Sequence, residues 1–367
     1  MLGKILRYVD KIIGFILYVF LSLFASSRKQ EKHAANNILV IKLWAIGETI
    51  LTLPAIKALK KKYPHCTITA CCTAYNKTIF EQCNDVDHVL VLNLRTIFRL
   101  KSKHADIAID FEPYTYFSSI IAFLAGAPMR IGFSNRRLLY THAIDPQPVH
   151  AVKNFINLVR VLGPAPYPTS LVPLIIPKTA ERKAKEWIKE NREKKNIIIG
   201  VHAGFGSSSS IRRWSDKNFA ALCDRLVEHY HATIVFVGSE REKTVNKRIM
   251  SLMKYPAREC YEQLPVTAAI IRQMGLFIGT DSGPMHLAAC MGMPTIGLFG
   301  PNSPKFYGPY GKKNIGLYKG PEEPYVKPFA GIFPERMKQE YNPNDITVDD
   351  VMAAVGKILK HARTRPS

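Results

Sequence analysis

Residues 276–301 read LFIGTDSGPMHLAACMGMPTIGLFGP, in which an apolar run, a polar turn, a helical segment and a second apolar run follow one another. We predict strands over 276–279 and 295–299 with a helix over 284–291 between them, which is a parallel βαβ unit. The helix begins at a proline, which is favoured in a first turn because its missing N–H would have no partner there. The stretch therefore indicates an open α/β sheet.

The same alternation continues on both sides of this stretch. In the second half we predict further strands over 197–202 and 233–238, with helices over 180–194, 216–229, 240–252, 266–274 and 348–362. In the first half we predict strands over 37–42, 67–72, 88–92, 106–111 and 130–133, with helices over 48–63 and 118–125. Glycine and prolines over 163–177 break the pattern and predict a linker. The sequence thus predicts two Rossmann-like, doubly wound domains over 36–165 and 178–345, with a C-terminal helix and tail over 346–367.

The N-terminal residues 1–30 do not follow this alternation. Residues 12–27, IIGFILYVFLSLFASS, carry no charge, and basic residues flank them on both sides (Lys4, Arg7, Lys11, Arg28, Lys29 and Lys32). A spanning helix needs about 20 apolar residues, so this stretch is short. We expect 1–30 to form an apolar helix that lies on a membrane, separate from the catalytic body. A single span, a cleaved signal peptide and an ordinary packed helix are the alternatives.

Composition and charge limit the classes of function. The chain has 367 residues, 47% of them hydrophobic and 22% charged, which excludes a disordered tail or a small disulfide-stapled module. A net charge of +22 favours phosphate-rich partners, namely nucleic acid, anionic lipid or a sugar nucleotide. Seven scattered cysteines without paired spacing indicate a reducing compartment and no zinc module. Because no helix-turn-helix or RNP-like run is present, we expect no nucleic-acid partner.

The polar turn before the predicted helix at 284–291 is the first candidate site. A helix N-terminus at the carboxyl end of a parallel strand presents N–H groups to a phosphate, and we expect those of Gly283, Met285 and His286 to point outward. The candidate phosphate-binding residues are Asp281, Ser282, Gly283, Pro284, Met285 and His286. The alternatives are an Asp cap with a tight turn, and for His286 an ordinary hydrogen-bonded helix residue.

The second candidate is residues 201–214, VHAGFGSSSSIRRW. Small residues such as Gly204 allow close approach of a diphosphate, and the guanidinium groups of Arg212 and Arg213 bind phosphate oxygens in a fork. The Walker pattern is absent, so this is not a P-loop. A solvated basic loop is the alternative.

The third candidate is residues 42–54, KLWAIGETILTLP. We expect Gly47 to make the turn from strand to helix and Glu48 to open the helix. The Glu48 carboxylate could take a proton from a substrate hydroxyl, because α/β folds place reactive groups at this edge. Capping of the helix is the alternative role.

Together, in this order and spacing, the three segments resemble glycosyltransferase family 9, the ADP-heptose:lipopolysaccharide heptosyltransferases. That family typically shows a Gly-Asp pair after its first strand, a Lys-Arg-Trp-like element and an Asp-Ser/Thr-Gly-Pro-Met-His-Leu-Ala-Ala run. The resemblance covers about residues 36–301, and it is most specific over 281–289. Two positions depart from the pattern, since Arg212 stands where Lys is usual and Glu48 stands where the catalytic-base Asp is usual.

The resemblance implies a GT-B architecture, with two domains facing across a cleft, and an inverting transfer that needs no metal and no cofactor besides the sugar nucleotide. It implies Glu48 as catalytic base and the residues of the first two candidates as the donor site. The implied donor is ADP-heptose or a related ADP-sugar, and the implied acceptor is an anionic lipid-linked oligosaccharide such as the lipopolysaccharide inner core. We expect a peripheral location at the cytoplasmic face of the inner membrane. Another nucleotide-sugar enzyme, such as an epimerase, and a non-catalytic basic membrane-binding relative remain alternatives.

Overall fold

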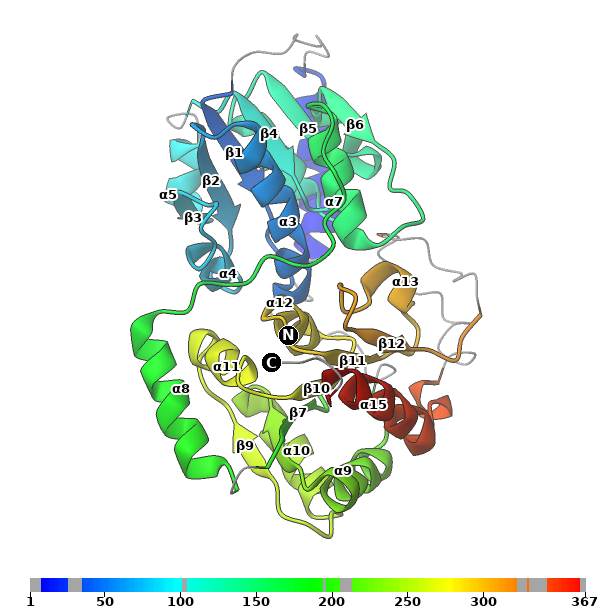
Figure 1. Ribbon diagram of the computed structural model, residues 1–367. Coiled ribbons are helices and arrows are strands. Elements are labelled where there is room, and N and C mark those ends of the chain that lie inside the picture. Colours follow the sequence, from blue (N-terminus) through cyan, green and yellow to red (C-terminus); the bar gives the residue numbers. More distant parts are fainter. Residues whose placement is uncertain are drawn as a thin grey trace. The chain divides into compact units, whose positions relative to one another are not determined.

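The computed structural model describes residues 8–25, 35–100, 104–193, 196–204, 213–321, 329 and 342–363. The chain divides into two compact units (Figure 1). The N-terminal unit comprises Met1–Pro168 and Lys327–Gly331, and the C-terminal unit comprises Thr169–Val326 and Ile332–Ser367. Each unit is an α/β body around one parallel sheet, so the two are described in turn.

The N-terminal unit has a six-stranded parallel sheet in the order β3-β2-β1-β4-β5-β6. Its strands are β1 (Asn37–Ile41), β2 (Thr67–Cys72), β3 (His88–Val91), β4 (Ile107–Asp110), β5 (Met129–Phe133) and β6 (His142–Ile144). Val40 of β1 lies opposite Ala70 on one side and Ile109 on the other, and all three are fully buried. Central strands that are covered on both faces have mainly apolar sequences, which explains NILVI in β1 and IAID in β4.

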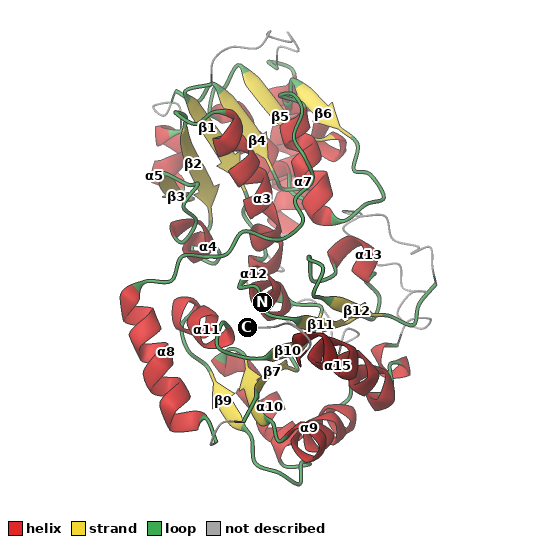
Figure 2. Ribbon diagram, viewed as in Figure 1, coloured by secondary structure: helices red, strands yellow, loops and turns green. Residues whose placement is uncertain are grey.

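Helices cover this sheet (Figure 2). They are α3 (Ile46–Lys62), α4 (Lys77–Glu81), α5 (Leu94–Arg99), α6 (Tyr116–Leu124), the 3₁₀ segment η3 (Ser134–Leu139) and α7 (Ala151–Arg160). Helices α3 and α7 are in contact with each other, and they lie side by side in Figure 1. Cations in the last turn of α3 complement the negative end of its helix dipole.

One aromatic residue from far along the chain completes this core. Phe329 is 2% exposed, and its ring lies 5.0 Å from that of Phe133 and 5.4 Å from that of Phe155 on α7. Aromatic rings at this spacing in tilted arrangements gain packing energy beyond their buried area. The N-terminal unit therefore includes chain that the sequence assigned to the C-terminal domain.

The N-terminal apolar segment forms a π-helical turn, η1 (Asp10–Gly14), followed by α2 (Phe15–Ser22). Among the described residues, no helix has both the length and the apolar character needed to cross a membrane. The segment contacts α6 and η3, and Tyr18 joins a small apolar cluster with Ile120 and Leu139. The expectation that it stands apart from the folded body is therefore wrong, because one of its sides supplies part of the packing of the N-terminal unit.

The C-terminal unit repeats the architecture with the order β12-β11-β10-β7-β8-β9, again entirely parallel. Its strands are β7 (Ile198–His202), β8 (Thr233–Val237), β9 (Arg258–Cys260), β10 (Leu276–Thr280), β11 (Thr295–Leu298) and β12 (Ile315–Leu317). Its helices are α8 (Lys178–Asn191), α9 (Asp216–Tyr230), α10 (Lys243–Met250), α11 (Leu264–Ile271), α12 (Gly283–Cys290), α13 (Pro304–Tyr307) and α15 (Val348–Arg363), with 3₁₀ turns η5 (Glu240–Glu242) and η6 (Pro343–Asp345). The predicted pair of α/β bodies is confirmed.

Trp214 fixes the last helix on this unit. Its side chain is fully buried, its ring lies 5.0 Å from that of Phe219 on α9, and its Nε1–H donates to the carbonyl of Ile346 at 2.8 Å. Ile346 lies two residues before the start of α15, which packs beside α9 (Figure 1). The C-terminal helix thus belongs to the C-terminal core.

We predict that Trp214→Phe lowers the free energy of unfolding of the C-terminal unit by about 1–3 kcal/mol, because the Ile346 carbonyl would be left buried without its donor. Urea unfolding followed by circular dichroism measures this loss. Tyr255→Phe is the matched control, since it removes a hydroxyl from an exposed ring and should change stability by less than about 0.5 kcal/mol. Equal losses in the two variants would contradict the role of this hydrogen bond.

Candidate active site

The strand order locates the candidate site in each unit. In both sheets the order reverses beside the first strand of the unit, between β1 and β4 and between β7 and β10. Ligands of open α/β sheets bind at the carboxyl ends of the strands at such a switch point. The residues that follow these strands are therefore the first to consider.

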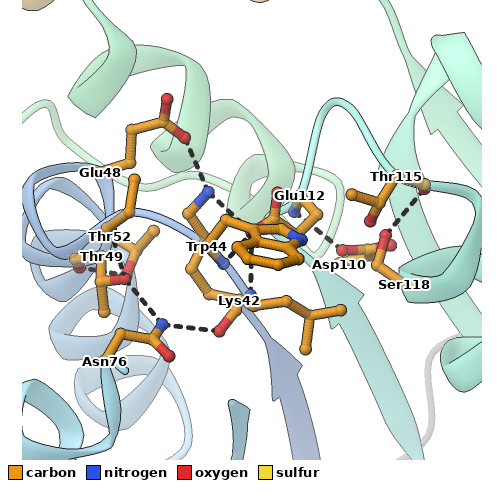
Figure 3. A network of polar contacts seen from close by, with 12 residues as sticks. Lys42, Trp44, Glu48, Thr49, Thr52, Asn76, Asp110, Glu112, Thr115 and Ser118 are labelled. Carbon is orange, nitrogen blue, oxygen red and sulfur yellow. Dashed lines mark hydrogen bonds and ion pairs between the residues drawn. The ribbon is translucent and has the colours of Figure 1, made fainter. Parts of the chain in front are cut away.

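At the edge of the N-terminal sheet, one buried cation lies against two carboxylates (Figure 3). Lys42 Nζ is 2.7 Å from Glu48 Oε2 and 3.0 Å from Glu112 Oε1. The side chains of Lys42 and Glu112 are fully buried, whereas that of Glu48 is 20% exposed. Of the three groups, Glu48 is therefore the one that can meet a substrate.

Glu112 is anchored from several directions. Its Oε1 also accepts hydrogen bonds from the backbone N–H groups of Leu43 and Trp44, at 2.8 Å and 2.7 Å. Burial raises the pKa of Glu112 above its usual value, although the neighbouring Lys42 opposes this shift. For Lys42, burial alone would lower the pKa, but Glu112 and Glu48 outweigh that effect and raise it. Lys42 is therefore held as a cation although its side chain is fully buried.

The turn between β1 and α3 differs from the prediction. The helix begins at Ile46, and the left-handed residue is Ala45, with φ of 62°, whereas Gly47 is buried inside the first helical turn. The expectation that Gly47 makes the turn is wrong. A non-glycine residue in this backbone region is uncommon and strained, and such residues gather at functional sites.

Polar residues from neighbouring strands hold this edge in place. Asn76 Nδ2 donates to the carbonyl of Lys42 and to Thr49 Oγ1, both at 2.9 Å. Asp110, the last residue of β4, accepts hydrogen bonds from Tyr140 Oη at 2.6 Å and from the backbone N–H of Glu112 at 2.8 Å. Burial raises the pKa of Asp110 to about 7. Glu112 is thus held by Asp110, which is itself fixed by a hydrogen bond from Tyr140.

At the edge of the C-terminal sheet, the ends of β7 and β10 are joined by a hydrogen bond from Thr280 Oγ1 to the carbonyl of Gly204. Asp281 is buried, and its carboxylate accepts a hydrogen bond from Asn302. Ser282 occupies the N-cap position of α12, but its hydroxyl donates to the Thr280 carbonyl at 3.0 Å. The predicted turn residues Gly204, Asp281 and Ser282 therefore lie together at the switch point.

The start of α12 agrees with the prediction in position and differs in detail. Gly283 is the first helical residue and Pro284 the second, and both are partly exposed together with Ser282. Met285 and His286 are buried, and the backbone N–H of His286 donates to the Ser282 carbonyl at 3.5 Å. The expectation that the N–H of His286 points outward is therefore wrong, because the helix uses it. Burial lowers the pKa of the His286 imidazole to about 4, so this side chain is neutral near pH 7.

Glu242, which the sequence analysis did not single out, places its carboxylate at the same edge of the C-terminal sheet. Glu242 Oε2 accepts hydrogen bonds from the backbone N–H and the hydroxyl of Ser239, at 2.7 Å and 2.9 Å. Glu242 Oε1 is 3.5 Å from His202 Nε2, and a Cβ on Gly204 would collide with it. In dinucleotide-binding folds an acidic residue near the end of the second strand binds the ribose hydroxyls. The signal in the sequence was an acidic residue soon after the strand TIVFV.

Of the two candidate arginines, only Arg213 is among the described residues. Arg212 lies outside the described residues, as do residues 205–211 of the small-residue loop. Arg213 is described, and its guanidinium pairs with Asp216 in the first turn of α9. Arg213 is therefore tied by an internal partner to its own helix. Over the described ranges, no group of three or more His, Cys, Asp or Glu side chains could hold a metal ion.

Comparisons with known proteins identify the family and the fold. The model of glycosyltransferase family 9 (heptosyltransferase) matches residues 94–327, more than half of the chain. The lipooligosaccharide heptosyltransferase 2 of Haemophilus ducreyi is 24% identical over 349 residues, which cover 83% of this chain and 98% of that protein. The glycosyl transferase family 9 structure from Veillonella parvula superposes with a TM-score of 0.78 at 24% identity, covering 91% of this chain and 100% of that one.

A second solved structure, the ADP-heptose lipopolysaccharide heptosyltransferase II of Escherichia coli, superposes with a TM-score of 0.72 at 19% identity. It covers 89% of this chain and 100% of the other. These likenesses show the fold, which is the two-domain GT-B type. The family match covers the C-terminal candidate residues together with Asp110 and Glu112 of the N-terminal edge, but not Lys42, Glu48 or Asn76. The chain belongs to glycosyltransferase family 9, the heptosyltransferases, and is a glycosyltransferase.

Proposed function

We propose that this enzyme moves a heptose, or a related sugar, from an ADP-sugar to the inner core of lipopolysaccharide or a similar lipid-linked oligosaccharide, with inversion at the anomeric carbon. The observation that carries the proposal is the Glu48 carboxylate, partly exposed and fixed by a buried lysine at the switch point of the N-terminal sheet. The names of the relatives support the donor and the acceptor class.

Glu48 is the proposed general base. Its Oε2 is held by Lys42, while its Oε1 accepts no hydrogen bond from the part of the chain that the structure describes. Oε1 can therefore accept the proton of the acceptor hydroxyl as that oxygen bonds to the anomeric carbon. The bond from the anomeric carbon to the diphosphate breaks on the opposite face, and the ADP leaves. Attack opposite to the leaving group inverts the configuration.

The C-terminal unit is the proposed donor site. The start of α12, with Ser282, Gly283 and Pro284 partly exposed, offers the positive end of a helix to the diphosphate. Arg212 supplies a full positive charge to the leaving phosphate. Glu242 supplies acceptor oxygens for ribose hydroxyls, and Ser239 keeps its carboxylate oriented. Asp281 and Met285 serve this site indirectly, because both are buried beneath it.

Glu48→Gln tests the base directly. It keeps the shape and the contact with Lys42 but removes proton acceptance, so turnover should fall by about 10²–10⁴ while donor affinity stays unchanged. Transfer from ADP-heptose to a heptose-free core oligosaccharide measures turnover, and the stereochemistry of the product is read by NMR.

Glu81→Gln is the matched control for this test, since Glu81 also pairs with a lysine on a helix of the same unit but lies exposed on α4. It should keep the wild-type rate. Glu48→Asp shortens the side chain by one methylene group, and a displacement of the carboxylate near 1 Å can lower the rate about a hundredfold. Unchanged transfer by Glu48→Gln would remove the base assignment, and release of free or isomerised sugar by the wild type without acceptor would indicate another nucleotide-sugar reaction.

The neighbouring arginines provide a second test. Arg212→Ala should weaken donor affinity about ten- to a hundredfold, because a charge-assisted phosphate contact contributes about 1.5–3 kcal/mol. Arg213→Ala should leave donor affinity within about threefold and lower thermal stability instead, since it breaks the pair with Asp216. Isothermal titration with ADP and thermal unfolding measure the two effects. The reverse pattern would move the phosphate contact to Arg213.

Removal of divalent metal ions is a third test. In the proposal, the charge on the leaving diphosphate is met by Arg212 and the helix start, so the rate should stay within about twofold after dialysis against EDTA. Transfer is measured before and after dialysis, and then after Mg²⁺ is restored. A loss that Mg²⁺ reverses would assign this charge compensation to a metal ion.

A further inference from the structure

The N-terminal segment leaves most of its surface apolar and uncovered by the described chain. Only Asp10, Gly14 and Tyr18, spaced along one side, are buried among residues 10–20. Ten of the sixteen exposed large hydrophobic residues among the described residues lie in it: Tyr8, Ile12, Ile13, Phe15, Ile16, Leu17, Val19, Phe20, Leu23 and Phe24. A patch of this kind on a soluble body marks an interaction surface.

The buried side is fixed to the folded body by polar contacts. The Asp10 carboxylate accepts the backbone N–H groups of Phe117 at 2.8 Å and Tyr116 at 3.2 Å, which caps the start of α6. Tyr18 Oη accepts the backbone N–H of Leu138 at 2.9 Å. At Gly14 a Cβ would come within 3.2 Å of Tyr116, so the glycine permits this close approach. A helix held by three points along its length presents a fixed outer face.

A second segment adjoins this face. Within η3, Arg137 and Leu138 are exposed, and the Arg136 guanidinium lies 3.8 Å from the centre of the Tyr116 ring. The Leu138 side chain is 51% exposed, next to the backbone N–H that Tyr18 accepts. We define the apolar face as the exposed apolar residues of 8–25 together with Leu138, and Lys11 and Arg137 adjoin it.

Basic residues predominate in the sequence of this segment, and Lys11 of the segment and Arg137 of η3 are exposed in the described part of the chain. Asp10 is the one acidic residue in the sequence of residues 1–30, and it is turned inward as the cap of α6. The flanking charges are Lys4, Arg7, Lys11, Arg28 and Lys29, with Arg137 from η3. Exposed aliphatic and aromatic residues next to Lys11 and Arg137, in a segment whose sequence is basic at both ends, suit an anionic lipid surface, where the apolar side chains enter the acyl boundary and the cations meet headgroups.

We propose that the apolar face binds an anionic lipid bilayer in the plane of its surface while Asp10, Gly14 and Tyr18 stay seated on α6. The helix does not cross the bilayer, because crossing would pull the Asp10 carboxylate away from the N–H groups that it caps. Tyr116 follows Glu112 by four residues, so the Asp10 end of the helix is seated close in the chain to the Lys42–Glu48–Glu112 group. This proposal rests on the proposed function only where it concerns a lipid-linked acceptor.

Vesicle sedimentation of the full-length protein tests the proposal. The vesicles contain phosphatidylethanolamine and phosphatidylglycerol at 3:1, with phosphatidylcholine alone for comparison. The triple variant Ile12→Gln/Ile16→Gln/Phe20→Gln should bind about tenfold more weakly or worse, since three side chains lose their burial in lipid. Lys11→Glu/Arg137→Glu should lose binding mainly to the anionic vesicles, and added salt should weaken wild-type binding.

Leu252→Gln is the matched control, because Leu252 is 49% exposed in the C-terminal unit and Phe20 is 54% exposed in the face. It should bind vesicles as the wild type does. Wild-type protein that stays in the supernatant, or a triple variant that binds equally well, would overturn the proposal. Self-association of the wild type that the triple variant abolishes, without vesicle binding, would instead assign the face to a second copy of this chain.

Two acceptors separate this proposal from the proposed function. The triple variant should keep transfer to a water-soluble core oligosaccharide and lose transfer to the same acceptor carried on lipid in vesicles. If the wild type binds vesicles but transfers sugar to neither acceptor, the proposed function fails and the membrane face remains. If the wild type and the triple variant transfer sugar equally well to both acceptors, the apolar face has no part in presenting the acceptor.

Discussion

A buried ammonium group between two carboxylates is the interaction on which the N-terminal edge depends. Burying Lys42 is costly by itself, and the cost is met only because Glu48 and Glu112 lie within 3.0 Å of Nζ. Glu112 in turn takes two backbone N–H groups from the turn that carries Ala45 in a left-handed conformation. Strand, turn and helix start are thus fixed by one charged group.

The same arrangement determines where a proton can be exchanged. Lys42 and Glu112 have no exposed side-chain surface, so neither can meet a substrate oxygen without rearrangement. Glu48 shares the cation but keeps a fifth of its side chain exposed. A group that is ordered by the protein and still reachable satisfies the geometric condition for a general base. The shell below it, from Asp110 and Tyr140 to Asn76, is fixed by hydrogen bonds.

Much of the fold could be predicted from the sequence, because fully buried parallel strands leave an unambiguous pattern. The strand TITACC was predicted at its observed bounds, Thr67–Cys72. The edge strands β6, β9 and β12 were missed, since each has three residues and partly exposed positions that give no apolar run. The helix α7 was also missed, although the apolar residues of AVKNFINLVR recur at helical spacing, and no Ser, Thr, Asp or Asn stands at its N-cap position.

Only part of the candidate site could be predicted, because some of its residues are close in sequence and others meet only in the fold. Glu48, Gly204 and the turn at Asp281 are local in sequence, so motif and strand end identify them. The contact of Lys42 with Glu112 joins residues 70 positions apart, because β1 pairs with β4, and no local pattern reveals it. Glu242 had only the weak local signal of an acidic residue after a strand, and its approach to His202 across 40 positions could not be read from that. The packed side of the N-terminal segment was missed because the buried residues Asp10, Gly14 and Tyr18 are spaced four apart, while most of the exposed residues between them are apolar as well, so no polar face marks the other side.

Phe329 has a consequence for the order in which the protein can be made. The N-terminal unit contains Met1–Pro168, yet the ring that lies against Phe133 and Phe155 comes from Lys327–Gly331. Synthesis on the ribosome proceeds from the N-terminus, and domains usually fold as they emerge. Here the first unit stays without one of its core aromatic residues until most of the second has been translated. Completion of the N-terminal core is therefore tied to near-completion of the chain, and a ribosome that stalls before residue 329 leaves neither unit finished.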